Sequence, residues 1–151
     1  MTKEDRYTAA LREIDVRLQK GGDLIADLGN TAAVLKKRLQ YFWTGFYLIK
    51  GNRLVLGPFQ GTPACVFLPL GGGVCGTCAA NRETMLVPDV GKFPGHIVCD
   101  TNSKSELCVP LFDGSGSVRA VLDMDSEFLD AFDGTDVKYC ERLAARLTGM
   151  W

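Results

Sequence analysis

The segment Phe93–Glu106, which reads FPGHIVCDTNSKSE, gathers four residue types that do chemistry in proteins. It contains the chain's single histidine, His96, followed by Cys99 and Asp100, and it ends on Glu106. Folds often place their reactive side chains on loops of this kind. An imidazole three residues before a cysteine can lower the pKa of the thiol, which suggests a Cys–His hydrolase, or it can simply hydrogen-bond the PGHI turn. In either case Cys99 is the strongest candidate for a reactive thiol.

Two further carboxylates alternate with apolar residues in the segment VLDMDS. Successive side chains of a strand point to opposite faces, so Asp123 and Asp125 share one face and their apolar neighbours share the other. The commoner explanation of such a pattern is that the acidic face is exposed to water. A hairpin at DGSGS, however, would bring Glu106 beside this pair at one end of a sheet. Three converging carboxyls can balance a bound cation and keep one group protonated as a general acid.

The chain has six cysteines, at positions 65, 75, 78, 99, 108 and 140. In a reducing compartment they indicate reactive, metal-binding or buried thiols more than a disulfide framework. Cys75 and Cys78 form a Cys-x-x-Cys pair, which zinc sites and redox motifs both use, but one isolated pair is a weak signal. Packing of Cys78 as a small apolar residue is the more common outcome. The glycines of LGGGVCGTC indicate a tight turn and a close backbone approach, and the segment lacks the lysine and hydroxyl of a phosphate loop.

The segment YFWTGFYL is rich in aromatic residues, which would by default lie in the core. Trp43, Phe46 and Tyr47 need not all be buried, however. An aromatic wall beside carboxylates suits a small ligand that has a cationic group or a sulfur atom.

Periodic apolar residues predict two N-terminal helices, over residues 2–20 and 24–39, with Asn30 as a candidate break in the second. A last helix is predicted over residues 133–150, with Asp133 as its N-cap. Its inward-facing residues are Val137, Cys140, Leu143 and Leu147.

Segments of β-type composition lie between these helices, and a glycine turn with a short helix at 71–83 interrupts them. The predicted strands cover residues 41–49, 54–60, 65–70, 84–90, 105–112 and 118–126. Terminal helices around consecutive strands predict an α+β layer fold with a largely antiparallel sheet of five or six strands.

Composition excludes several classes of protein. The 151 residues are 46% hydrophobic and 23% charged, with a net charge of −1, which is typical of one globular domain spanning residues 1–151. Without an excess of basic residues, nucleic acid is not expected as a partner. No apolar run approaches the roughly 20 residues that cross a bilayer, and the charged N-terminus lacks the apolar core of a secretion signal. We therefore expect a cytoplasmic protein.

Six motifs, in their order and near their spacing, resemble the free methionine-(R)-sulfoxide reductases, a family of stand-alone GAF-domain enzymes. They are FWTGFYL, LGPFQGTPAC, GGGVCGTCA, VPDVGKFPGHIVCD, SKSELCVPL and AVLDMDS, and they extend from about Tyr41 to Ser126. The resemblance implies a GAF-like α+β fold and an enzyme that needs no cofactor and no metal.

The family's site residues correspond to particular positions of this chain. The resemblance implies that Cys99 is the nucleophile, that Cys65 usually resolves it, and that Cys75 is an alternative partner. The implied pocket tryptophan is Trp43, and the implied acidic residues are Glu106, Asp123 and Asp125. The chain departs from the family pattern at Gly72, Cys78, Cys108 and Cys140. We expect the extra thiols to pack in the interior, although Cys78 leaves open which cysteine resolves.

The implied reaction is the reduction of free L-methionine (R)-S-oxide. The Cys99 thiolate attacks the sulfoxide sulfur while a carboxylic acid, from Glu106 or Asp125, protonates the departing oxygen. Cys65 then condenses with the Cys99 sulfenic acid, and thioredoxin reduces the disulfide. The remaining carboxylates, including Asp123, bind the substrate's ammonium group beside Trp43. A homodimer is possible. Two other interpretations are a non-catalytic GAF sensor of a small ligand or of redox state, and a structural zinc module.

Overall fold

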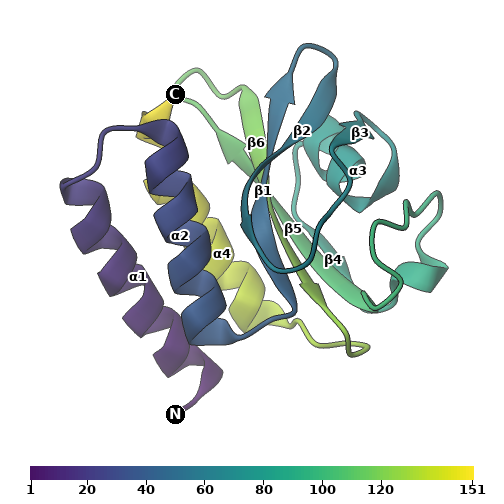
Figure 1. Cartoon of the computed structure of the whole chain (residues 1–151), viewed down its shortest axis with the longest axis horizontal. Coiled ribbons are helices and arrows are strands. Elements are labelled where there is room, and N and C mark those ends of the chain that lie inside the picture. Colours follow the sequence, from purple (N-terminus) through teal and green to yellow (C-terminus); the bar gives the residue numbers. More distant parts are fainter.

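A single antiparallel sheet organises the computed structural model, which describes residues 1–151 (Figure 1). Its strands are β1 (Trp43–Lys50), β2 (Arg53–Gln60), β3 (Phe67–Pro69), β4 (Met85–Val87), β5 (Ser105–Phe112) and β6 (Val118–Ser126). They lie in the order β3-β2-β1-β6-β5-β4, and every neighbouring pair is antiparallel. The predicted α+β fold with an antiparallel sheet is confirmed, with six strands.

Helices cover the two faces of the sheet unequally. Helices α1 (Lys3–Gln19), α2 (Leu24–Leu39) and α4 (Gly134–Arg146) lie on one side, and the short helix α3 (Gly73–Asn81) lies on the other with the long loops (Figure 1). Because the short helix α3 covers its face of the sheet only partly, that face has room for a site. None of the helices is long and apolar enough to cross a membrane.

Side-chain caps mark the start of the three long helices, α1, α2 and α4. Thr2 and Asp5 form a capping box at the start of α1, and Asp23 accepts a hydrogen bond from the backbone N–H of Ala26 in α2. The predicted N-cap of α4, Asp133, is confirmed by its bonds from the backbone N–H groups of Thr135 and Asp136. The predicted break at Asn30 is wrong. Its side chain is exposed, and the buried stripe of α2 continues on both sides of it.

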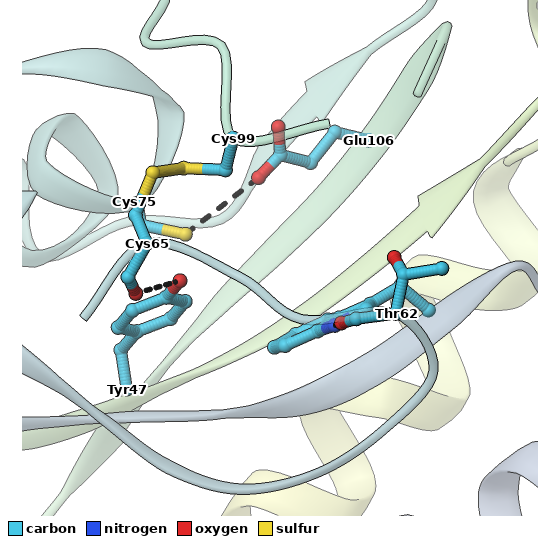
Figure 2. Close-up of a disulfide and its surroundings, with 7 residues drawn as sticks. Tyr47, Thr62, Cys65, Cys75, Cys99 and Glu106 are labelled. Atoms are coloured by element: carbon cyan, nitrogen blue, oxygen red, sulfur yellow. Dashed lines mark hydrogen bonds between the residues drawn. A yellow bond between two sulfur atoms is a disulfide. The ribbon is translucent and has the colours of Figure 1, made fainter. Parts of the chain in front are cut away.

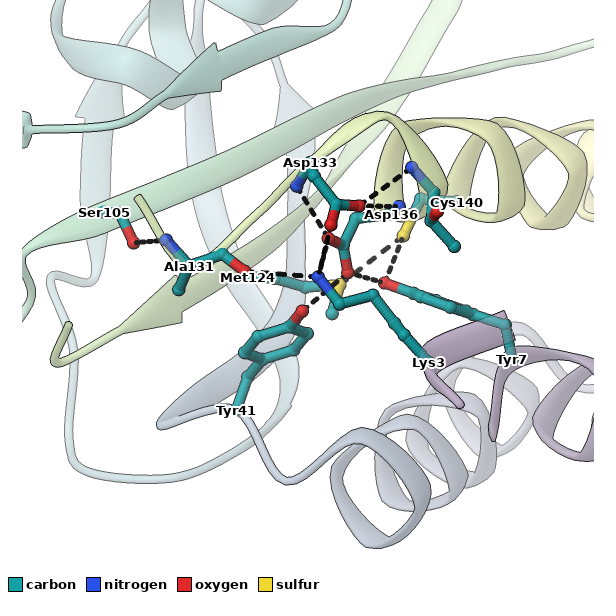
Figure 3. Close-up of polar contacts among 10 residues, drawn as sticks. Lys3, Tyr7, Tyr41, Ser105, Met124, Ala131, Asp133, Asp136 and Cys140 are labelled. Atoms are coloured by element: carbon teal, nitrogen blue, oxygen red, sulfur yellow. Dashed lines mark hydrogen bonds and ion pairs between the residues drawn. The ribbon is translucent and has the colours of Figure 1, made fainter. Parts of the chain in front are cut away.

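Asp136 joins the two ends of the chain on the helical side of the sheet (Figure 3). Its fully buried carboxylate accepts hydrogen bonds from the hydroxyls of Tyr7 (2.5 Å) and Tyr41 (2.6 Å). It also pairs with the ammonium group of Lys3 at 2.7 Å. Helix α1, the segment before β1 and helix α4 therefore meet at one charge.

The two edge strands are shorter than predicted. Strand β3 covers only Phe67–Pro69 of the predicted 65–70, and β4 covers only Met85–Val87 of the predicted 84–90. An edge strand pairs with one neighbour only, so nothing extends it beyond that neighbour's ladder. A 3₁₀ turn, Val90–Lys92, follows β4, and Asp89 caps it.

Two apolar cores lie on opposite faces of the sheet. The larger one, under α1, α2 and α4, contains Leu122 and Met124, and the smaller one, under α3, contains Trp43 and Tyr47. The burial of two predicted residues differs from expectation. Phe46 belongs to the helical core, so the three aromatic residues of β1 are all buried but on different faces. Val137 is only half-buried, at the margin of the helical core.

Candidate active site

The face of the sheet under α3 places the predicted site residues in two adjacent rows. Trp43 of β1 lies opposite Asp125 of β6, which lies opposite Glu106 of β5. In the next row on the same face, Asp123 of β6 lies opposite Cys108 of β5. Directly opposite residues on one face have Cβ atoms about 5 Å apart, so the ladder itself brings these side chains together.

The three carboxyls form one buried cluster. Oxygens of Glu106, Asp123 and Asp125 lie within 4.8 Å of one another, and the side chains are 5%, 5% and 9% exposed. The explanation that this face is simply wet is therefore wrong. Helix α3 and the long loops cover it, which the strand pattern alone does not reveal.

Burial raises the pKa values of the three carboxyls, so they hold protons more tightly than exposed carboxyls do. Burial and the neighbouring Asp125 charge raise the pKa of Glu106 well above its ordinary value. Burial also raises the pKa values of Asp123 and Asp125, with further increases from Glu106 and Asp123 respectively. Since like charges at this distance cannot all ionise easily, protons are shared within the cluster. One carboxyl can therefore act as a general acid near neutral pH.

Helix α3 adds a thiol to this cluster. Cys75, in its first turn, is buried, and its thiol donates to Glu106 Oε2 at 3.6 Å (Figure 2). The close backbone approach predicted from the glycines is present, because a Cβ at Gly76 would lie 2.1 Å from the carbonyl oxygen of Pro69. A residue without a side chain thus lets α3 lie against β3 and aim Cys75 at the carboxyls.

A disulfide joins Cys65 and Cys99, with an S–S distance of 2.03 Å (Figure 2). The two cysteines are 34 residues apart and lie on separate loops, one before β3 and one before β5. Of the two, Cys99 is exposed and Cys65 is half-buried. The pairing that the family resemblance implied for the first resolving step is the pairing in the structure.

Three hydrogen bonds hold these two loops in place. Trp43 Nε1 donates to the carbonyl oxygen of Thr62 at 2.9 Å, and the Tyr47 hydroxyl donates to the carbonyl oxygen of Cys65 at 2.8 Å. The Thr62 hydroxyl donates to Asp100 Oδ2 at 2.8 Å and so links the Cys65 loop to the Cys99 loop. No sequence pattern indicated a role for Thr62 or a positioning role for Asp100, because the two residues are 38 positions apart and meet only in the fold.

His96 hydrogen-bonds the turn, as one of its two interpretations expected, but it does so through its backbone. Its backbone N–H donates to the carbonyl of Phe93 at 3.2 Å, but its buried Nδ1 has no hydrogen-bond partner. Burial lowers the pKa of its imidazole, so the side chain lines the site as a neutral ring. The sulfur of Cys99 is bonded to Cys65 and not paired with this imidazole.

A cavity of about 50 Å³ joins these groups. Its lining includes Trp43, Tyr47, Cys75 and Cys99, together with His96 and the three carboxyls. The arrangement combines a sulfur that can react, a thiol within reach to form a disulfide with it, a proton donor and an aromatic wall. It suits the thiol-dependent reduction of a small polar molecule.

The other thiols lie in the interior, as expected. Cys78 and Cys108 are fully buried beneath the cavity, in the smaller core. Cys140 is fully buried in the helical core, 3.6 Å from the sulfur of Met124, and burial raises its pKa to about 12. Of these three residues, Cys108 alone directly faces an acidic site residue across the ladder.

Known proteins resemble this chain over most of its length. A family model described as "GAF domain" matches residues 23–149. "GAF domain-containing protein A" of Dictyostelium discoideum is 46% identical over 143 residues, which cover 94% of this chain and 90% of the relative. The "Free methionine-R-sulfoxide reductase" of Escherichia coli is 40% identical over 148 residues, which cover 97% of this chain and 89% of the relative.

A solved structure agrees with both the fold and the family. The free methionine-R-sulfoxide reductase from Neisseria meningitidis, in complex with its substrate, superposes with a TM-score of 0.95 at 45% sequence identity. The match covers 98% of this chain and 89% of that one. The chain therefore belongs to the GAF-domain family and, within it, to the free methionine-R-sulfoxide reductases.

Proposed function

We propose that the protein reduces free L-methionine (R)-S-oxide to L-methionine, with Cys99 as the nucleophile and Cys65 as its resolving partner. The observation that supports this most directly is the position of the Cys65–Cys99 disulfide. It borders a cavity whose floor is a cluster of three buried carboxyls. A non-catalytic sensor needs neither the paired thiols nor the proton donor.

The first step needs a thiolate and an acid on the same cavity. The Cys99 thiolate attacks the sulfoxide sulfur, and a protonated carboxyl, from Glu106 or Asp125, donates its proton to the oxygen. This attack forms a bond between the two sulfurs. The hydroxyl then moves to the Cys99 sulfur as the substrate's sulfur–oxygen bond and the new sulfur–sulfur bond both break, so that methionine leaves and Cys99 becomes a sulfenic acid. The raised pKa values of both carboxyls supply that proton near neutral pH.

The second step returns the enzyme to its thiol form. The Cys65 thiol attacks the sulfenic sulfur, water leaves, and the disulfide forms. Thioredoxin then supplies two electrons by thiol–disulfide exchange, for which the exposed Cys99 is accessible. Cys75 is the reserve partner, since its thiol also lines the cavity.

The acidic cluster also accounts for a free amino acid as substrate. A free amino acid has an α-ammonium group, whereas a residue inside a peptide has a neutral amide with chain on both sides. Three carboxyls exceed what one proton transfer requires, so Asp123 and its neighbours bind the ammonium while Trp43 lies against the S-methyl group. Removal of one charge-assisted hydrogen bond typically costs about 1.5–3 kcal/mol, so Asp123→Asn should lose roughly 10- to 100-fold in kcat/KM.

The decisive experiment is a thioredoxin assay coupled to NADPH with separated epimers of free methionine sulfoxide. The native protein should consume the R epimer and leave the S epimer and N-acetylmethionine sulfoxide nearly untouched. Cys99→Ser should abolish turnover, because an alcohol is a far weaker nucleophile than a thiolate. Equal rates on free and N-acetylated substrate would identify a general methionine sulfoxide reductase instead, and activity in Cys99→Ser would place the nucleophile elsewhere.

A further inference from the structure

Beneath the cavity, three donor atoms from three different elements lie close together. The sulfurs of Cys75 (α3) and Cys108 (β5) and a carboxylate oxygen of Asp123 (β6) all lie within 4.8 Å of one another. Cys108 and Asp123 face each other across the β5–β6 ladder, and α3 brings Cys75 over them. The reaction proposed above assigns no role to Cys108.

The chemistry of this donor set is that of a thiophilic cation. Two thiolates and a carboxylate match the ligands of zinc, whereas magnesium and calcium take oxygen ligands almost exclusively. Tetrahedral zinc holds its ligand atoms roughly 3.3–3.8 Å apart, so side-chain movements of about 1 Å would complete the geometry. Glu106 Oε2, which lies 3.6 Å from Cys75 Sγ, is available as a fourth ligand.

A buried oxygen at the same place has no partner. Asp123 Oδ1 has no hydrogen-bond partner, although Asp123 is only 5% exposed. Such an atom needs a shared proton or a bound cation, because an unpaired polar group inside a protein is costly. The thiols beside it make a soft metal ion a suitable cation.

We propose that Cys75, Cys108 and Asp123 form a binding site for a thiophilic divalent cation, Zn²⁺ above all, and that this ion blocks the substrate cavity. The ion enters from the cavity, which Cys75 and Asp123 line, and Cys108 completes the site from below. The blocking effect rests on the proposed function, because it uses the carboxylate assigned to the substrate's ammonium group. The binding itself does not.

Binding is an exchange of protons for metal and involves no redox change. Two S–H bonds break, two Zn–S bonds form, and two protons leave to solvent. Free thiols are protonated at neutral pH, so a metal ion must displace these two protons to bind.

The test of binding uses the oxidised protein, whose Cys65–Cys99 disulfide removes those two sulfurs from competition. Titration calorimetry with Zn²⁺ should show one equivalent bound, and Co²⁺ should give a thiolate-to-cobalt charge-transfer band. Cys108→Ala should weaken Zn²⁺ binding by about 100-fold or more and remove that band. The matched control is Cys140→Ala, which deletes a fully buried thiol from the other core and should bind as the native protein does.

The test of blocking uses the reduced protein in a single turnover without thioredoxin, so that no other metal-sensitive protein is present. Zn²⁺ should compete with methionine sulfoxide, EDTA should reverse the effect, and Cys108→Ala should be active and resistant to Zn²⁺. Unchanged Zn²⁺ binding in Cys108→Ala, or no binding by the oxidised native protein, overturns the proposal. An oxidised protein that binds Zn²⁺ but whose reduced form never releases methionine overturns the proposed function instead and leaves the metal site standing.

Discussion

At the scale of single residues, burial decides what the acidic and thiol groups can do. An exposed carboxyl is ionised at neutral pH, whereas Glu106 and Asp125, shielded from water and next to each other, hold protons that a reaction can use. Cys75 is likewise a neutral thiol inside the site, while Cys99 is exposed on its loop. The proposed nucleophile, reserve thiol and proton donor thus differ by environment more than by residue type.

The proposed order of the two chemical steps predicts the behaviour of Cys65→Ser. This variant should release methionine in its first turnover as fast as the native protein, because Cys65 enters only after the sulfenic acid forms. Its recycling by thioredoxin should be slow. Single-turnover methionine release measured without reductant separates the two steps. Loss of that release would make Cys65 part of the first step, and a mild effect on recycling would point to Cys75 as the substitute.

The raised pKa of Glu106 predicts how stability depends on pH. The native protein holds this proton more tightly than the unfolded chain, so the stabilisation is fully present below the ordinary carboxyl pKa of about 4.3 and is lost as pH rises through the raised value. Glu106→Gln cannot ionise. It should therefore gain about 1 kcal/mol or more of unfolding free energy over the native protein on going from pH 4.5 to pH 8.

Urea denaturation of the native and variant proteins at both pH values measures this difference. The matched control is Glu127→Gln, which changes an exposed glutamate just after β6 and should shift stability equally at both values. If Glu106→Gln changed the unfolding free energy equally at both pH values, as the control should, then burial would not be what holds the Glu106 proton.

At the scale of elements, the site depends on two loops that side-chain hydrogen bonds help to hold in place. The Cys65 loop is tied to β1 through Trp43 and Tyr47, and the Cys99 loop is tied to the Cys65 loop by the bond between Thr62 and Asp100. Loops without ladder hydrogen bonds rely on such side-chain contacts for their position. The distance between the two sulfurs is therefore controlled by residues that do no chemistry themselves.

The bond between these loops predicts a selective defect in Thr62→Val. Valine keeps the shape of threonine but cannot donate to Asp100, so the loops should approach less often. Disulfide formation after the first turnover should slow by about 3- to 10-fold, while methionine release stays unchanged. Thiol titration during a single turnover follows the disulfide. Thr101→Val, in the Cys99 loop but with no hydrogen bond from its side chain, should behave as the native protein does. An equal loss of methionine release in Thr62→Val would instead indicate a disturbed cavity.

At the scale of the whole molecule, the sheet separates a large core that supports the fold from a smaller one that supports the site. The helical core contains 23 buried residues and the core under α3 contains 12. The larger core closes around Asp136, where both ends of the chain meet (Figure 3). Stability and activity should therefore respond to different substitutions.

The buried charge at this meeting point predicts a large effect of Asp136→Ala. Removal of the carboxylate leaves the Lys3 ammonium and the hydroxyls of Tyr7 and Tyr41 without their partner, so the free energy of unfolding should fall by about 3–5 kcal/mol. The exposed cap Asp133→Ala should cost only about 1 kcal/mol. Urea denaturation compares the two, with Asp136→Asn as a milder change should the alanine variant not fold. If Asp136→Ala lowered the free energy of unfolding no more than Asp133→Ala does, the contacts of Asp136 with Lys3, Tyr7 and Tyr41 would not stabilise the fold.

The sequence by itself determined the elements, because local patterns suffice for them. Apolar periodicity predicted the three long helices, a glycine turn predicted the short one, and alternation predicted that Asp123 and Asp125 share a face. The hairpin between β5 and β6 then brings Glu106 beside them, since register across a short turn follows from the chain itself. These predictions depend on contacts between near neighbours in the chain.

Only the tertiary structure decided what surrounds those residues. Burial of the carboxyls, the side of the sheet that Phe46 faces, and the bond between Thr62 and Asp100 all depend on segments far apart in the chain. The meeting of Cys75 with Cys108 is of the same kind, because α3 and β5 come together only once the sheet has formed. Pattern reasoning describes one element at a time, whereas pKa values and metal-binding geometry depend on every group within a few ångströms.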